Sequence, residues 1–299
     1  MKLKLLSFLS FFSLLSFTWA GDVNPYHLAK DTNWYYHYNF EAAHQSELAI
    51  EFKDEIDELF SRIKEFDLIG LNPSEDLSSF TLYGNPQKQA VAILEGQFNA
   101  SLLLTLKDLK AKKEFVNGYQ VYQNKKLFAT IHEDKFIVVA KNKEDLSKAL
   151  NVINGLEPHL EIENNLLQSN AIASAAITDI DLAKHKLEKF GKSFMMSLPI
   201  KKISYSLKDN GTSYTTSFNV LSDSEVTKSL ALLASGYLGL SETYLKNLPK
   251  FKAFVKAIQV SPEDDLLTVS STVQNQDLRP LLIHFLEKAK NYQQKKSTK

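Results

Sequence analysis

The chain has 299 residues, with 35 basic and 35 acidic side chains and no cysteine. A formal net charge of zero provides no strong field for nucleic acid or anionic lipid. The lack of cysteine excludes disulfides, thiolate nucleophiles, cysteine-ligated zinc and a lipid-modified N-terminal cysteine.

The N-terminal segment has the layout of a secretory signal peptide. Lys2 and Lys4 precede an apolar run from Leu5 to Phe17, and Thr18-Trp19-Ala20 closes it with small residues at the −3 and −1 positions of a cleavage site. The run is shorter than the roughly 20 residues that span a bilayer, so a retained membrane anchor is the weaker alternative. We expect cleavage after Ala20 and a periplasmic or secreted mature chain without a transmembrane anchor.

The first half of the mature chain predicts strands and helices in mixed order. A strand at Trp34–Phe40 precedes a long helix that extends to about Glu65, according to the spacing of its apolar residues. The later predicted elements are strands at Phe80–Tyr83 and Ala90–Leu94, a helix at Asn99–Leu109, strands at Tyr119–Tyr122, Leu127–Ile131 and Phe136–Ala140, and a helix from Asn142 to Ile153 that ends at Gly155.

The second half predicts a similar order. Asp209-Asn210-Gly211 marks a hairpin turn, and Ser222 with Glu225 forms a capping box. The predicted elements are a strand at Ile172–Ile177, a helix through Leu182 and Phe190, strands at Ile203–Leu207 and Tyr214–Val220, a helix through Leu230 and Leu233, strands at Val255–Val260 and Leu266–Val273, and a last helix from about Gln276 that ends in a basic tail.

Alternation along the strands predicts an antiparallel sheet with one apolar face. The two rows of one strand are Tyr214, Thr216, Phe218 and Val220 against Ser213, Thr215, Ser217 and Asn219. A face rich in hydroxyls is typical of a sheet with helices on one side and water on the other. We therefore predict an α+β fold of two similar open-faced layers, either separate or sharing one continuous sheet.

The repeated order predicts a tandem duplication. We expect a signal peptide at 1–20, an α+β domain at 21–160 and a second α+β domain at 161–299 with the basic C-terminal tail. The polar segment Glu157–Ser169 is the predicted join. Chance recurrence of a common arrangement is the alternative, because the identity between the halves is low.

Linear catalytic motifs are missing from the sequence. It contains no Gly-x-x-x-x-Gly-Lys, Gly-x-Ser-x-Gly or His-Glu-x-x-His segment. The residues His132, Glu133 and Asp134 fit a hairpin tip better than a metal site. We therefore predict no catalytic residues, no metal and no cofactor.

The aromatic segment Asn33–Phe40 stands out by composition. If Trp34 and Tyr36 face the core, Tyr35 and His37 lie on the open face of the sheet. Exposed aromatic and hydroxyl side chains are common on strands and need no function. The candidate binding residues on this face are Tyr35, His37, Thr215 and Ser217.

Four segments resemble those of a broad set of exported bacterial proteins of unknown activity. They are Leu82-Tyr83-Gly84, Ala90–Phe98, Gly118–Tyr122 and the Asp145–Leu150 helix. The resemblance implies a bacterial envelope location and a tandem α+β plan. It implies no activity and transfers no functional residue to this chain.

These observations favour an exported, non-enzymatic protein that binds a partner, such as another envelope protein, or assembles in the envelope. One alternative is an exported hydrolase whose site combines dispersed residues between the halves. Another is a carrier of an apolar ligand. The sequence leaves the oligomeric state open.

Overall fold

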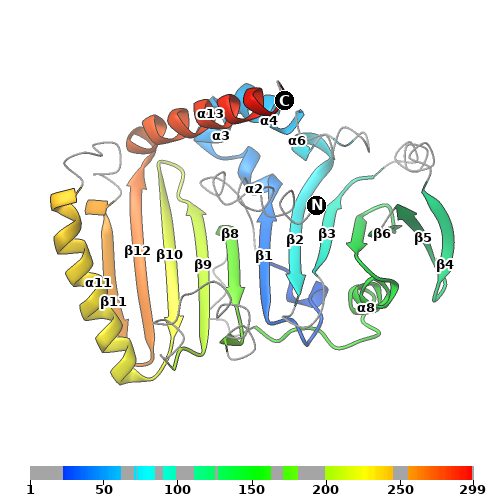
Figure 1. Cartoon of the computed structure of the whole chain (residues 1–299), viewed down its shortest axis with the longest axis horizontal. Coiled ribbons are helices and arrows are strands. Elements are labelled where there is room, and N and C mark those ends of the chain that lie inside the picture. Colours follow the sequence, from blue (N-terminus) through cyan, green and yellow to red (C-terminus); the bar gives the residue numbers. More distant parts are fainter. Residues whose placement is uncertain are drawn as a thin grey trace.

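A computed structural model of the chain describes residues 23–61, 71, 73–84, 90–98, 111–124, 127–162, 171–180, 199–244 and 255–297. The described strands form one antiparallel sheet with helices packed against it (Figure 1). The strands are β1 (Trp34–Asn39), β2 (Leu77–Gly84), β3 (Val91–Gly96), β4 (Lys112–Val116), β5 (Tyr119–Asn124), β6 (Leu127–His132), β7 (Phe136–Ala140), β8 (Ala171–Ile177), β9 (Lys202–Asp209), β10 (Ser213–Leu221), β11 (Ile258–Glu263) and β12 (Leu266–Gln274). The helices are η1 (Pro25–His27), α2 (Phe40–His44), α3 (Glu47–Glu51), α4 (Lys53–Ser61), α6 (Pro73–Asp76), α8 (Lys143–Ile153), α11 (Ser224–Tyr244) and α13 (Asn275–Ser297).

The two halves of the chain share this sheet. Its strand order is β11-β12-β10-β9-β8-β1-β2-β3-β7-β6-β5-β4. Outward from the centre, each half places three strands in chain order and then its remaining strands in reverse, four in the first half and two in the second. β1 and β8 pair at the centre, with Trp34 opposite Ile177 and Tyr38 opposite Ala173. The predicted antiparallel α+β fold is confirmed, in its continuous-sheet form. A duplication as its origin and the domain boundary at 160 remain predictions.

The predicted long helix after β1 is a series of three short helices. The Asn39 side chain accepts a hydrogen bond from the Ala42 N–H at 3.0 Å and caps α2. The Ser46 hydroxyl accepts one from the Ala49 N–H at 3.2 Å and caps α3. Because each cap starts a new helix, the segment bends across the sheet instead of running straight.

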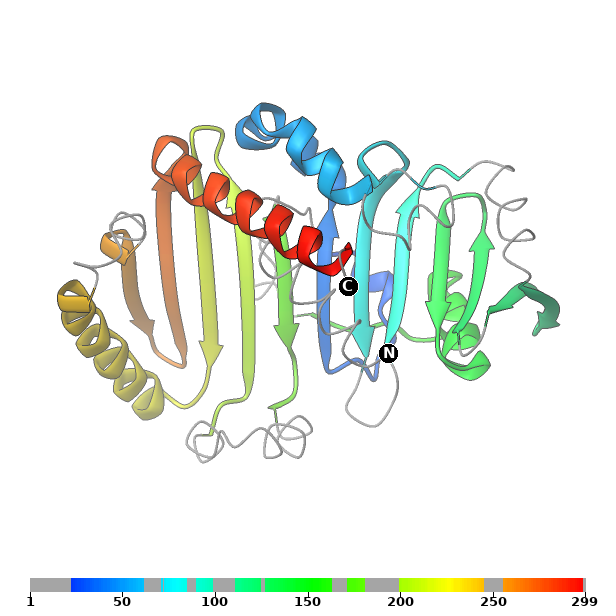
Figure 2. The same cartoon turned by 45° about the horizontal axis from the view of Figure 1, so that its top comes forward.

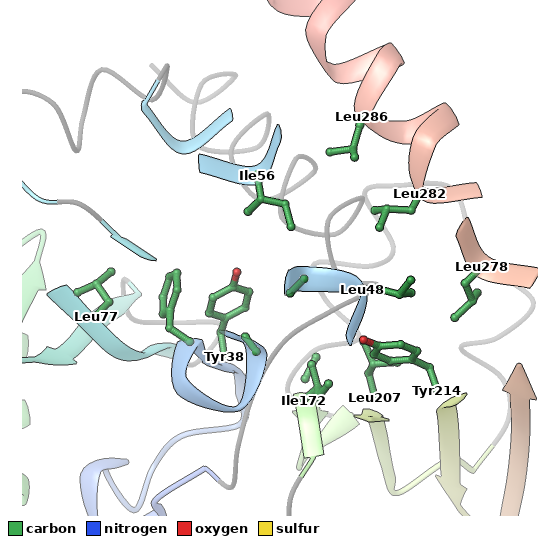
Figure 3. Packing of buried hydrophobic residues seen from close by; sticks show 14 of the residues in the cluster. Tyr38, Leu48, Ile56, Leu77, Ile172, Leu207, Tyr214, Leu278, Leu282 and Leu286 are labelled. Carbon is green, nitrogen blue, oxygen red and sulfur yellow. The ribbon is translucent and has the colours of Figure 1, made fainter. Parts of the chain in front are cut away.

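The main core lies on the face of the sheet that carries Tyr36 and Tyr38. The helices α2, α3, α4 and α13 cover it, and α13 crosses the strands of the second half (Figure 2). Leu278, Leu282 and Leu286 of α13 point toward α3, α4 and the strands beneath (Figure 3). The last helix of the chain therefore packs on helices of the first half. On the same face, α11 covers a smaller cluster with Val220 and Leu267.

On the opposite face, the described elements that cover the first half of the sheet are η1, α8 and the chain next to them, including Val23, Leu28 and Leu160. Leu146 and Leu150 of α8 pack there with Tyr35, Ile93 and Val138, whose side chains alternate with those of the main core. Helices therefore lie on both faces of the sheet, which corrects the expectation of helices on one side only.

Most predicted strands are observed with ends shifted by a few residues. Three departures stand out: β4 was not predicted, the last helix begins one residue early, and β11 begins at Ile258 and includes Pro262. The signal peptide at 1–20 and the predicted helices at Asn99–Leu109 and through Leu182 and Phe190 lie outside the described residues.

Candidate functional site

A line of polar side chains crosses the face of the sheet opposite the main core. His37 of β1 lies opposite Ser174 of β8, and Ser206 of β9 lies between Ser174 and Ser217 of β10. Directly opposed residues share a face, so these side chains form one row across the strands. We call it the polar row, and it comprises Thr81, His37, Ser174, Ser206, Ser217 and Ser270.

His37 is the titratable member of the polar row. It is buried, and a hydrogen bond of 2.7 Å joins its Nδ1 to the Thr81 hydroxyl. Burial, and to a lesser extent the nearby His27, lowers the pKa of His37 to about 3. The imidazole is therefore neutral at neutral pH and is a weak proton acceptor there, which makes it a poor general base.

The centre of the polar row is closed to solvent. Ser174, Ser206 and Ser217 are all buried. The Ser174 hydroxyl has no hydrogen-bond partner within the described part of the chain. Thr215 lies two residues before Ser217 on the same face of β10 and is half-buried. Its Oγ1 is 2.8 Å from that of Thr272 and accepts a hydrogen bond of 2.9 Å from the Asn210 amide.

The four predicted binding residues share a face but do not form one compact site. Tyr35 and His37 lie on β1, whereas Thr215 and Ser217 lie on β10, three strands and about 14 Å away. Tyr35, His37 and Ser217 are buried, which corrects their expected exposure. Tyr35 is covered because α8 and η1 pack on this face, and burial raises its pKa. Whether any of the four binds a ligand remains a prediction.

Chemistry at a metal centre has no support in the described residues. No group of three or more His, Asp or Glu side chains among them is arranged to hold a metal ion. No described helix has the length and apolar character to cross a membrane.

The exposed surface of α11 is a second candidate site. Leu232 is 76%, Leu233 49% and Tyr237 75% exposed, although all three belong to one helix packed on the sheet. With 3.6 residues per turn, the three positions lie within about 140° around the helix axis, so they share one side of the helix. Gly236 and Gly239 on this helix face open space, since a Cβ added to either would meet no atom within 4 Å. We call Leu232, Leu233, Gly236 and Tyr237 the α11 surface.

The sequence carries a signal for the α11 surface that our prediction missed. From Ser229 to Ser241 the chain has no charged residue. A helix that packs on a sheet with one side normally places charged residues on the other. A charge-free stretch of this length within a helix therefore indicates either full burial or an apolar surface, and only the structure distinguishes the two.

Comparison with known proteins identifies structural neighbours but no family. No family profile and no curated protein sequence matches the chain. Solved structures of TP0453 have a similar fold: crystal form III aligns with a TM-score of 0.56 and 11% identity over 87% of this chain and 98% of that chain. Crystal form I gives a TM-score of 0.53 and 11% identity over 88% and 98% of the two chains. At this identity the likeness establishes the fold alone.

Proposed function

We propose that this protein is exported and acts as a non-enzymatic binding protein that holds a protein partner through the α11 surface. The observation that carries the proposal is the exposure of Leu232 and Tyr237 on a helix segment without charge. Contiguous exposed apolar side chains on a folded protein are typical of an interaction site. The signal-peptide layout of residues 1–20 supports export.

The energetics favour a partner with an apolar surface. Burying one exposed leucine or aromatic side chain contributes about 1.5–3 kcal/mol. A partner that covers Leu232, Leu233 and Tyr237 gains this term without desolvating a charge on α11, because the nearest charged residues in the sequence are Lys228 and Glu242. A protein rather than an anionic membrane fits best, since Lys228 is the only basic residue of the helix.

The hydrolase and carrier alternatives have less support. The polar row offers a hydroxyl array around one neutral, buried histidine, and the described residues contain no metal-binding group. No described observation favours either alternative over partner binding.

Photocrosslinking in the native host tests the proposal. A benzoylphenylalanine at Tyr237 should give a discrete crosslinked product with one envelope protein, and the same probe at Lys228 on the same helix is the matched control. The partner, once purified, should bind the chain from Gly21 directly and should lose at least about tenfold in affinity for the Leu232→Ser, Tyr237→Ser double variant.

Two results would contradict partner binding through the α11 surface. One is equal binding of the partner to the wild type and the double variant. The other is crosslinking to lipid alone, together with vesicle binding that the double variant loses. Recovery of soluble intracellular protein that retains Met1 would contradict the exported location.

A further inference from the structure

The strand β4 forms one outer edge of the sheet, and half of its backbone groups point away from the sheet. It pairs with β5 through a two-residue turn, in which Asn117 and Gly118 have φ values of 49° and 85°. These values are typical of a type I′ hairpin, in which the flanking residues Val116 and Tyr119 form a hydrogen-bonded pair. Because such pairs alternate along an antiparallel ladder, the N–H and C=O groups of Lys113 and Phe115 face outward.

The opposite edge of the sheet carries a protecting proline, whereas no described residue protects β4 in this way. The register of β11 with β12 places Glu263 opposite Leu266 across a two-residue turn, so Pro262 falls at an outward-facing position. A proline there removes the donor that another strand would need. β4 contains no proline, and its register with β5 has no bulge. Figure 1 places β4 at one end of the sheet and β11, with α11, at the other.

The side chains of β4 add an aromatic ring and a cation to this edge. Phe115 is 71% exposed, and the Lys113 ammonium lies 5.8 Å from the centre of its ring. Glu114 points to the other face, where its carboxylate pairs with the Lys143 ammonium at 2.7 Å. Glu114 is therefore engaged, and no other described acid pairs with Lys113, which can meet a carboxylate of a partner.

We propose that β4 binds an extended segment of a partner protein, which adds to the sheet as an antiparallel strand. The outward N–H and C=O groups of Lys113 and Phe115 provide four hydrogen bonds to it. An apolar or aromatic residue of the segment lies opposite Phe115, and an Asp or Glu two residues later lies opposite Lys113. This edge is separate from the α11 surface, so each is tested without the other.

A second copy of the same chain fits the β4 edge poorly. Two-fold pairing centred on Lys113 places two lysines opposite each other, and pairing centred on Glu114 opposes two glutamates. Pairing centred on Phe115 avoids like charges, but it leaves Lys113 opposite the turn residue Asn117 and only one well-placed hydrogen-bonded pair. The edge thus favours a different chain whose residues complement Lys113.

Hydrogen exchange with a defined peptide tests this binding mode. The probe is the peptide Thr-Phe-Thr-Glu-Thr, blocked at both ends, which places Phe opposite Phe115 and Glu opposite Lys113. In the free protein the amides of Lys113 and Phe115 should exchange much faster than that of Glu114, which bonds to β5. Peptide at about nine times its Kd should slow exchange at Lys113 and Phe115 by about tenfold.

Three variants separate edge pairing from general adhesion. Phe115→Pro removes an outward N–H and no bond to β5, and it should abolish the protection; Phe115→Thr, which keeps the N–H, should retain part of it. Lys113→Glu should bind the peptide at least about fivefold more weakly than the wild type. Its affinity should be restored for the charge-reversed peptide Thr-Phe-Thr-Lys-Thr. Unchanged exchange at Lys113 and Phe115, or equal binding by Phe115→Pro, would overturn the proposal. Self-association lost in Phe115→Pro, with no effect of the peptide, would instead identify a second copy as the occupant.

Discussion

At the scale of single residues, the buried histidine on β1 links stability to pH. His37 is neutral in the folded protein because burial lowers its pKa to about 3, whereas an unfolded chain gives a histidine pKa of about 6.5. The unfolded state therefore binds a proton first as the pH falls. The stability that this site contributes is complete above about pH 6.5 and is lost progressively down to about pH 3.

Replacement of His37 by glutamine should flatten this pH dependence. Between about pH 7.5 and about pH 5 the wild type should lose about 2 kcal/mol more unfolding free energy than His37→Gln, measured by urea denaturation. Thr81→Val is the control: it removes the hydrogen bond to His37 but keeps the histidine, so it should lower stability at both pH values and keep the wild-type slope. Equal slopes for the wild type and His37→Gln would contradict the assignment.

Two glycines should respond oppositely to alanine. A Cβ added at Gly96 in β3 would overlap the carbonyl oxygen of Asp76, a backbone atom, whereas one added at Gly236 in α11 meets open space. Gly96→Ala should therefore lose about 1–3 kcal/mol of unfolding free energy. Gly236→Ala should gain up to about 1 kcal/mol, because alanine favours the helix. Thermal unfolding of both variants checks this. A Gly96→Ala variant as stable as the wild type would show that β3 and the backbone at Asp76 move apart readily.

At the scale of elements, the sequence predicts best where the local signals agree. Asn142 caps α8 by accepting the Asp145 N–H at 2.7 Å, and Gly155 follows the helix with a φ of 70°, as expected from those residue types. The strand β4 was missed because Lys112, Lys113 and Glu114 form a charged run that lacks the apolar alternation of a half-buried strand. Its pairing with β5 through the Asn117-Gly118 turn overrides this weak pattern.

The attachment of α13 should depend on its leucines more than on its ion pairs. Arg279 contacts Glu51 at 2.7 Å and Glu47 at 3.0 Å, but all three side chains are well exposed, so Arg279→Ala should cost less than about 1 kcal/mol. Leu281 is buried, and Leu281→Ala should cost about 2–5 kcal/mol. Ile283→Ala, on the exposed side of the same helix, should be near neutral. Urea denaturation ranks the three variants by unfolding free energy. A larger loss for Arg279→Ala than for Leu281→Ala would contradict this prediction.

At the scale of the whole molecule, the sequence predicts the kinds of element but not how the halves combine. Strand patterns indicate an antiparallel α+β plan because alternation depends on neighbours in the chain. The pairing of β1 with β8 and the burial of Tyr35 and His37 depend on segments far apart in sequence, so no local pattern determines them. The same limit applies to the polar row, whose six members come from six strands.

The shared sheet predicts that both halves unfold together. Trp34 on β1 is the only tryptophan once residues 1–20 are removed, so its emission reports on the first half at the junction with β8. Ala173→Asp places a carboxyl in the buried part of β8 and should lower the urea midpoint of Trp34 emission and of far-ultraviolet circular dichroism equally. The conservative Ala173→Ser control should shift both much less. A Trp34 transition that stays in place would show that the halves unfold independently.

The central position of β1 also sets an order of events during synthesis. β1 ends at Asn39, but its neighbour on one side, β8, begins only at Ala171. A chain that emerges amino end first therefore carries β1 with one flank unsatisfied while most of the first half appears. Until β8 follows, that flank is open to pairing with the wrong strand or with another nascent chain, so the sheet around β1 is completed only when the second half arrives.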